Sequence, residues 1–231
     1  MNASSFGGFA GIVFDAYGTL FDVTAIEEAC APHVSDPSAF AGTWRAKQLE
    51  YSFLRTLMDR YADFGQITSD ALDYTTTLYG ADFSPLQRAT LMQAWLTLPA
   101  FPEAPLALDK LQAGGHRMVV LSNGTRQMLE PLLTHSGIRS AFIDLLTSER
   151  VQCFKPDPSM YALVATRIYA RMNEILFVTA NGFDLAGAKA AGFTVCRVDR
   201  YGLPCDLLDY EADIVVHDLL ELAGLLSDDM K

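Results

Sequence analysis

The chain has few positive charges. Its 231 residues include 17 lysines and arginines against 28 aspartates and glutamates, and the formal net charge is −11. Nucleic acids and anionic membranes bind proteins through basic surfaces, so this balance argues against both as partners. A small anionic substrate remains compatible with it, provided that the few cations are placed locally at its site.

Three further features are missing. The four cysteines form no C-x-x-C pair, which argues against a zinc site. The start, MNASSFGGFA, has neither the basic segment nor the apolar segment of a secretion signal. No stretch approaches the roughly eighteen apolar residues that a membrane helix needs. We therefore expect a cytoplasmic protein with reduced thiols.

Half of the residues are hydrophobic, which is enough for a sizeable core. Short apolar runs alternate with stretches at helical spacing. The predicted strands are 11–15, 117–122, 142–147, 175–179, 194–198 and 213–216, and the clearest helices between them are 127–135, 158–170 and 184–191. This alternation predicts an α/β fold, a Rossmann-like parallel sheet with helices on both faces.

One segment breaks the alternation. Between residues 20 and 97 there is no good strand, while apolar residues of 53–61 recur at helical spacing and 86–98 reads as another helix. We therefore predict an α-helical cap subdomain at 20–97, inserted into a core domain formed by 1–19 and 98–231.

Polar residues stand where the predicted strands end. Asp15 ends the first strand, Ser122 ends the second, and the segment 179–184 follows the fourth, while Lys155 lies in the loop CFKPD. Singly, each is explained by a helix cap, a turn or a loop. Ligands bind at the carboxyl ends of parallel strands, so the combination predicts one shared site.

The chain resembles the haloacid dehalogenase superfamily over nearly its whole length. The resemblance rests on four segments in the same order, FDAYGT, LSNG, FKPD and FVTANGFD. Most members of that superfamily are magnesium-dependent phosphotransferases, with a second aspartate two residues after the nucleophile. Here that residue is Tyr17, whose phenol, with an ordinary pKa of about 10, is a poor acid near neutrality. Ala180 stands where the phosphatases carry a metal-binding aspartate. We therefore expect neither a metal nor another cofactor.

Without an acid at position 17 and a metal ligand at position 180, the chemistry that fits is one whose leaving group needs no proton. Halide is such a leaving group. The helix WRAKQLEYSFLRTLMDRY, residues 44–61, is similar to that of the (S)-2-haloacid dehalogenases, as is FDAYGTLFDV. Helical spacing leaves Arg45, Arg55 and Arg60 equivalent, and the resemblance selects Arg45. It implies a homodimer that hydrolyses small anionic (S)-2-haloacids to (R)-2-hydroxy acids and halide ion.

The resemblance also implies a mechanism. Asp15 attacks C2 of the substrate, expels halide and forms an ester that water then hydrolyses. Lys155 is expected to keep Asp15 ionised, because a nearby cation favours the charged carboxylate. Thr19 is expected to hold the rotamer of Asp15, and Arg45 to receive the halide beside Asn123.

The hydrolytic water is expected to be activated by Asp184 and oriented by Asn181 and Thr179. The donors expected for the substrate carboxylate are the Ser122 hydroxyl and the N–H groups of Ala16 and Tyr17. The expected apolar wall consists of Tyr17, Leu49, Phe64 and Phe183. For Leu49 and Phe64, ordinary core packing explains the residue as well as a place in this wall does. Tyr161 matches a tyrosine that the family has near the lysine, and a structural role explains it equally well.

The last motif departs from the family, in which many members have Ser-Ser-Asn-Ala-Trp-Asp where this chain has Thr-Ala-Asn-Gly-Phe-Asp at 179–184. The changes leave the substrate range open. Two other functions also stay open: a magnesium-dependent phosphatase of the same superfamily, and a non-catalytic binding protein with this fold.

Overall fold

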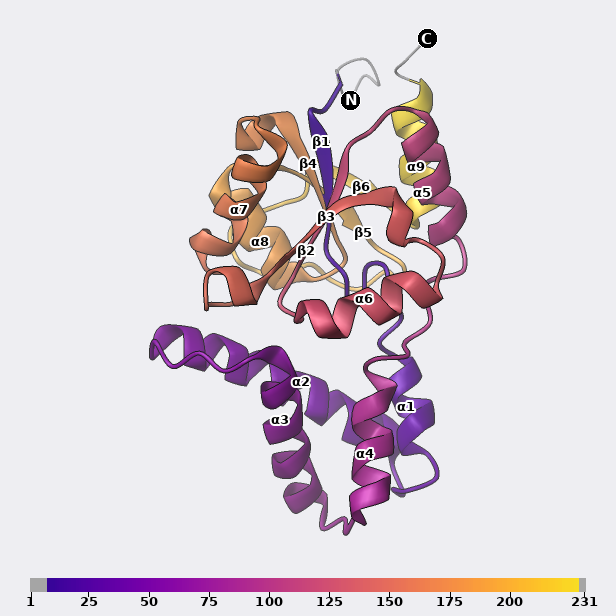
Figure 1. Ribbon diagram of the computed structural model, residues 1–231, viewed down its shortest axis with the longest axis vertical. Helices are drawn as coiled ribbons and strands as arrows, with labels where there is room; N and C mark the ends of the chain where they lie inside the picture. Colours follow the sequence, from indigo (N-terminus) through magenta and orange to yellow (C-terminus); the bar gives the residue numbers. More distant parts are fainter. Residues whose placement is uncertain (1–7, 229–231) are drawn as a thin grey trace.

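A computed structural model describes residues 8–228 (Figure 1). The ends of the predicted core domain, 1–7 and 229–231, lie outside this range, as does most of the segment read for a secretion signal. A parallel sheet of six strands has the order β3-β2-β1-β4-β5-β6. The strands are β1 Gly11–Phe14, β2 Met118–Ser122, β3 Phe142–Thr147, β4 Ile175–Thr179, β5 Thr194–Val198 and β6 Ile214–Val216.

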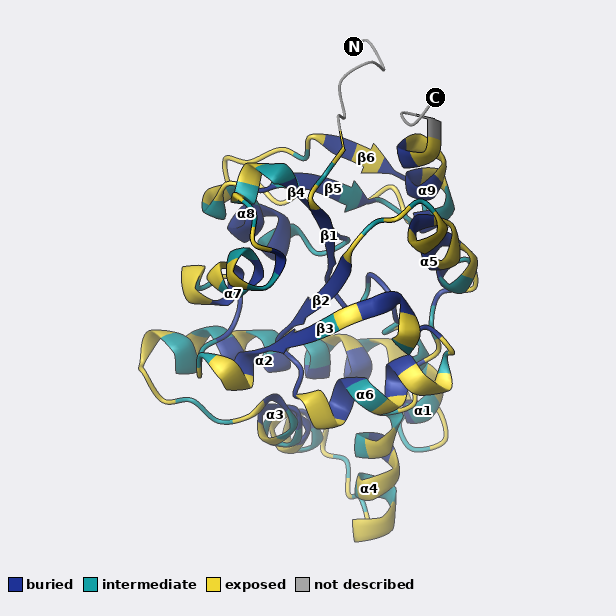
Figure 2. Cartoon of the chain, turned by 45° about the horizontal axis from the view of Figure 1, so that its top comes forward, coloured by how far each residue is buried: buried dark blue, intermediate teal, exposed yellow. Residues whose placement is uncertain are grey.

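Helices cover both faces of the sheet (Figure 1). On one side lie α5 Ala104–Ala113, α6 Arg126–His135 and α9 Leu219–Asp228, and on the other α7 Pro158–Ile168 and α8 Gly182–Ala191. Short 3-10 helices span Arg139–Ala141, Ser148–Arg150 and Met172–Glu174. In β1, Ile12 and Phe14 enter one core and Val13 the other. The central strands are buried throughout (Figure 2) and apolar except at their last residues, Ser122 in β2 and Thr179 in β4.

The predicted α/β fold class is confirmed, and each predicted strand has its counterpart in the sheet. Boundaries differ slightly. The strand predicted at 11–15 ends at Phe14, which leaves Asp15 just beyond it. The helix predicted at 158–170 ends at Ile168, because Tyr169 takes a left-handed conformation with φ 60°. The helix predicted at 86–98 is shorter and ends at Ala94.

The first four of the five helices between β1 and β2 form a block beyond the carboxyl ends of the strands (Figure 1). They are α1 Ala25–Cys30, α2 Pro37–Leu57, α3 Phe64–Tyr79 and α4 Pro85–Ala94. Both α2 and α4 begin with a side-chain cap followed by proline, Asp36 before α2 and Ser84 before α4. The helical spacing of apolar residues at 53–61 covers only the last turn of α2, because the helix ends at Leu57, and Leu57 is exposed. Phe40 and Trp44 fill the interior instead. The division into core and cap stays a prediction.

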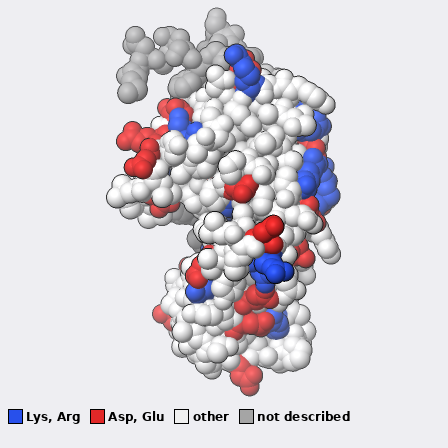
Figure 3. All heavy atoms as spheres, turned by 90° about the vertical axis from the view of Figure 1, so that its left-hand side faces the viewer, with Lys and Arg blue, Asp and Glu red and all other residues white. Residues whose placement is uncertain are grey.

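Within residues 8–228, no helix is both long and apolar enough to cross a bilayer. The four cysteines are free thiols. Acidic and basic side chains are interspersed on the face that Figure 3 shows.

Candidate active site

Asp15 lies at the centre of the sheet, one residue past β1, and its side chain is 9% exposed. Its N–H donates to the Val178 carbonyl at 3.0 Å, which ties the end of β1 to β4. The chain then turns through Gly18, whose φ of +83° suits glycine. The turn brings the Thr19 hydroxyl back to donate to Asp15 Oδ2 at 3.1 Å. The predicted contact between Thr19 and Asp15 is thus present.

Four side chains donate hydrogen bonds to Asp15. On Oδ2, Asn181 Nδ2 lies at 2.6 Å and Thr179 Oγ1 at 3.4 Å, beside Thr19. Lys155 Nζ reaches Oδ1 at 3.1 Å. A protonated acid would have to donate one bond, so this all-donor surrounding fits an ionised carboxylate. Asn181 and Thr179 therefore contact the nucleophile candidate itself, and their predicted role toward water stays a prediction.

Lys155 links the two carboxylates of the site. Its side chain is 1% exposed, and Nζ lies 3.1 Å from Asp15 Oδ1 and 2.7 Å from Asp184 Oδ2. Its own N–H donates to Asn123 Oδ1 at 2.8 Å, so the LSNG segment holds the lysine loop. Burial alone would lower the pKa of Lys155, but the charges of Asp15 and Asp184 outweigh it and raise that pKa. The lysine is therefore a fixed cation.

Asp184 is fully buried near the start of α8. Burial raises its pKa to about 6, Lys155 opposes that shift, and the charge of Asp15 adds to it. Tyr161 donates to Asp184 Oδ1 at 2.8 Å, which also favours the charged form. Gly187 leaves room for this phenol, since a Cβ there would lie 2.2 Å from its oxygen. Asp184 therefore accepts protons in the range of a useful general base.

The helical block contributes one arginine to the site. Arg55 pairs with Asp70 at 3.1 Å and Arg60 is exposed, whereas Arg45 Cζ lies 5.9 Å from the Tyr17 ring centroid. Burial lowers the pKa of Arg45, and the charge of Asp15 partly offsets this. Among the described residues no carboxylate lies within 4.0 Å of its guanidinium; its partner is the amide oxygen of Gln48. Arg45 is thus a cation free to meet an external anion.

The donors predicted for the substrate carboxylate lie on the core side. The Ser122 hydroxyl accepts from the Gly124 N–H at 3.1 Å and keeps its own proton available. Within the described chain, the N–H groups of Ala16 and Tyr17 donate to no protein acceptor. Tyr17 itself is buried, and burial raises the pKa of its phenol above the ordinary value. It therefore cannot serve as the acid that phosphatases carry two residues after the nucleophile.

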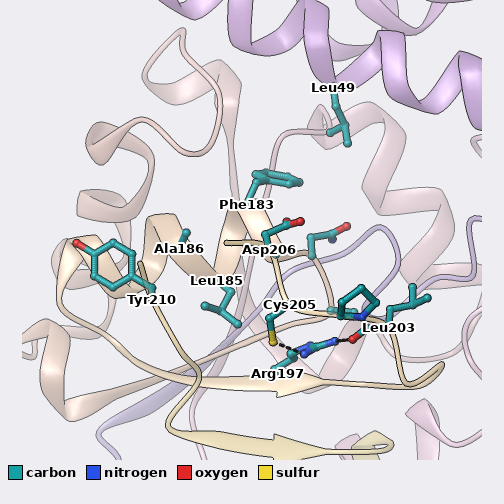
Figure 4. A pocket seen from close by; sticks show the side chains of 13 residues that line it. Leu49, Phe183, Leu185, Ala186, Arg197, Leu203, Cys205, Asp206 and Tyr210 are labelled. Atoms are coloured by element: carbon teal, nitrogen blue, oxygen red, sulfur yellow. Dashed lines mark hydrogen bonds between the residues drawn. The ribbon is translucent and has the colours of Figure 1, made fainter. Parts of the chain in front are cut away.

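A cavity of about 310 Å³ opens beside Asn181 (Figure 4). Leu49, from α2, faces Phe183, from α8, across it, and the segment 203–206 closes another side. The predicted apolar wall is thus divided: Leu49 and Phe183 line this cavity, whereas Phe64 is buried against Tyr17 and Phe154. Asn181 lines this cavity and also donates to Asp15, so the cavity adjoins a residue that holds the carboxylate.

Residues 9–192 match the family model of the haloacid dehalogenase-like hydrolases. The chain belongs to this family. The (S)-2-haloacid dehalogenase H-109 of Pseudomonas putida is 39% identical over 94% of this chain and 98% of its own length. An (S)-2-haloacid dehalogenase of Pseudomonas sp. (strain YL) is 40% identical over 83% of each chain. The L-2-haloacid dehalogenase of Xanthobacter autotrophicus, solved with chloropropionic acid covalently bound, superposes with a TM-score of 0.88 at 34% identity, covering 95% of this chain and 98% of the other.

Two residues of this hydrolase lie at the site although no motif contains them. Arg200 donates to the Thr19 carbonyl at 3.1 Å, pairs with Glu103 and stacks over the Phe101 ring at 3.7 Å. It thereby fixes the turn that carries Thr19. Trp95 lies just after α4. Its ring centroid is within 6 Å of the Tyr17 ring centroid and within 6 Å of Arg45 Cζ. Nothing in the local sequence of either residue signals these contacts.

Replacing Tyr161 by phenylalanine is expected to shift the acidic limb of the pH profile of this hydrolase upward from about pH 6. The phenol stabilises charged Asp184, so its loss raises the pKa of that carboxyl further. The measurement is the rate of intermediate breakdown in single turnover, from pH 4.5 to pH 8. Tyr169→Phe, an exposed tyrosine just past the same helix, is the control and should leave the profile unmoved.

Proposed function

We propose that this chain hydrolyses (S)-2-haloalkanoic acids to (R)-2-hydroxyalkanoic acids and halide, through an ester on Asp15. The observation that carries the proposal is a buried carboxylate that only accepts hydrogen bonds, followed two residues later by a phenol that cannot act as an acid. Halide is the anion of a strong acid and leaves without a proton. The names of the relatives and the covalent complex of one neighbour support the same chemistry.

The first step is proposed to be attack by Asp15 Oδ1. This oxygen receives one donor, Lys155, whereas Oδ2 receives three. Ser122 and the N–H groups of Ala16 and Tyr17 would hold the substrate carboxylate. A bond then forms from Oδ1 to C2 while the carbon–halogen bond breaks with inversion. The halide leaves toward Arg45, whose guanidinium has no carboxylate partner within residues 8–228, with Asn123 beside it.

The second step is proposed to be hydrolysis at the Asp15 carboxyl carbon. Once Oδ1 is alkylated, Oδ2 becomes the ester carbonyl oxygen, and its donors Thr19 and Asn181 would stabilise the negative charge that develops there. Asp184 takes a proton from the attacking water, whose oxygen bonds to that carbon. The ester bond then breaks, the alkoxide takes up the proton from Asp184 and leaves as the 2-hydroxy acid, and the Asp15 carboxyl releases the second water proton to solvent. Asp15 is thereby regenerated.

The proposal includes the organisation of the chain. Residues 20–97 would act as a cap that closes over the strand ends. Two contacts link this block to the loops beside Lys155: the Phe154 N–H donates to Thr56 Oγ1 at 3.0 Å, and the Tyr61 and Ser148 hydroxyls lie 3.2 Å apart. The homodimer and the cytoplasmic location stay predictions.

The magnesium-dependent phosphatase is less well supported by the residues present. Within the described chain, no three or more histidine, cysteine, aspartate or glutamate side chains are grouped to hold a metal ion. Ala180 offers no ligand where phosphatases carry an aspartate, and a hard cation needs several oxygen ligands. A resident magnesium ion therefore does not fit, and no step is assigned to one.

One assay tests the proposed function. The protein is incubated with (S)-2-chloropropanoate in excess EDTA, and free chloride is measured with the (R) isomer as the control. We expect chloride from the (S) isomer and (R)-2-hydroxypropanoate as the organic product. No chloride at any pH from mildly acidic to strongly alkaline would refute the proposal, and magnesium-dependent phosphate release from a monoester would favour the phosphatase.

A further inference from the structure

The segment between β5 and β6 closes one side of the cavity of about 310 Å³ (Figure 4). Leu203 and Asp206 belong to this exposed segment, and both line the cavity together with Leu49 and Phe183. None of the four sequence motifs contains the segment, and no step of the proposed mechanism uses it. Asp206 thus brings a negative charge to the cavity from outside the motifs.

The group on C2 of a 2-haloacid has one direction left to it. In the proposed reaction the substrate carboxylate meets Ser122 and the turn after β1, and the halogen points toward Arg45. Leu49 follows Arg45 by four residues on α2, so the two side chains lie on one face of that helix, one turn apart. Leu49 lines the cavity, and so does Asn181, which holds Asp15. The cavity is therefore the space into which the group on C2 extends.

Asp206 is packed against the start of α8. A Cβ added to Gly182, the first residue of that helix, would overlap the Asp206 carboxylate and would lie 3.0 Å from the Asp206 Cβ. Rotation of the carboxylate does not move its Cβ, so this close approach requires a glycine. The partial positive charge at the start of a helix favours a carboxylate there. Asp206 is thereby held beside Phe183, as Figure 4 shows.

We propose that Asp206 selects against substrates whose side chain ends in a second anion. This rests on the proposed function and narrows its substrate class: the enzyme takes (S)-2-haloacids with an uncharged alkyl group and rejects 2-halodicarboxylic acids. A distal carboxylate in the cavity would lose hydration between the apolar side chains of Leu49 and Phe183. It would also meet the like charge of Asp206, and both effects weaken binding.

A competing explanation is that Arg197, which lines the same cavity, attracts a distal carboxylate. Its guanidinium is already engaged, because it donates to the Leu203 carbonyl and to Cys205 Sγ and lies 3.3 Å from Asp199 Oδ1. These contacts tie the segment to β5 and offset the positive charge. The two explanations predict opposite preferences, because an arginine that received the substrate would make the dicarboxylic acid the better one.

The test compares (S)-2-chlorobutanoate with (S)-2-chlorosuccinate, whose side chains end in a methyl group and a carboxylate. We expect a lower kcat/KM for chlorosuccinate in the wild type. Asp206→Asn, which keeps the size of the side chain, should raise the ratio of chlorosuccinate to chlorobutanoate kcat/KM by about threefold to tenfold, and less at high ionic strength. Gly182→Ala, which displaces the carboxylate, should raise the ratio too.

Two matched controls should leave this ratio unchanged. Asp209→Asn makes the same change on an exposed residue of the same segment that does not line the cavity. Gly224→Ala adds a methyl group in α9, where nothing lies within 4 Å of it. A wild-type preference for chlorosuccinate, or a ratio that neither Asp206→Asn nor Gly182→Ala moves, overturns the proposal.

A binding measurement separates this proposal from the proposed function. Calorimetry gives the affinities of (R)-2-hydroxybutanoate and (R)-2-hydroxysuccinate, the product acids of the two substrates, without any turnover. Asp206→Asn should strengthen binding of the second acid by the same threefold to tenfold, roughly the effect of one screened charge, and leave the first unchanged. Equal effects on both acids would refute the role of Asp206. Absence of chloride release from both substrates would instead count against the proposed function.

Discussion

Asp15→Asn is expected to lower the rate of chloride release by about 10⁴-fold or more, as loss of a nucleophile does in other enzymes with covalent intermediates. The asparagine amide keeps the size of the side chain but supplies a far weaker nucleophile. It also offers one oxygen where the site presents donors to two: Lys155 on one side and Asn181 and Thr19 on the other. The measurement is chloride released from (S)-2-chloropropanoate in EDTA, with the circular dichroism spectrum as a check on folding.

The control for this substitution lies in the same motif. Asp22→Asn makes the same chemical change seven residues later, where the carboxylate accepts from Thr24 outside the site. It should keep most of the activity. For the wild-type protein, a single turnover in ¹⁸O-labelled water should place the label in the peptide that contains Asp15. Label that appears first in the hydroxy acid would contradict attack by Asp15, even if the asparagine variant is inactive.

The gathering of the site was predictable because it follows from topology. Parallel strands end at one edge of a sheet, so residues at the ends of β1, β2 and β4 must meet there, however far apart they lie in sequence. Asp15, Ser122 and Asn181 were predicted on that ground. The positions of Lys155 and Asp184 depend on the loop and helix that follow those strands, and the resemblance to the family is what predicted them.

Other features depend on packing between distant segments, which local sequence does not encode. Leu49 and Phe64 were equivalent as wall candidates, but of these two only Leu49 lines the cavity, where it faces Phe183 of α8 (Figure 4), whereas Phe64 is buried. Arg200 reaches Thr19 from 181 residues away, and its sequence neighbourhood is an ordinary loop. Trp95 has the spacing of a buried helix residue, and its contacts with Tyr17 and Arg45 arise only when distant segments pack together.

Lys155→Met is expected to reduce the free energy of unfolding by about 3–5 kcal/mol near pH 8, the cost of removing one partner from a buried ion pair. The variant leaves Asp15 and Asp184 facing each other with no cation between them. The pKa of Asp184, already raised to about 6 by burial, should rise further. Chloride release should fall at least about a hundredfold, because a protonated Asp184 cannot take a proton from water.

The sign of the pH dependence distinguishes this electrostatic cause from lost packing. A carboxyl whose folded-state pKa is raised stabilises the fold fully below its unfolded pKa of about 4, and this contribution is lost as pH rises through the folded value. The deficit of Lys155→Met against wild type should therefore be smaller at pH 4.5 than at pH 8 in urea unfolding. Lys189→Met removes a partly exposed lysine of α8 that pairs with Asp213. It should reduce the free energy of unfolding by less than about 1 kcal/mol at either pH. An equal deficit at both pH values for Lys155→Met would mean that the lysine acts through its aliphatic stem rather than through its charge.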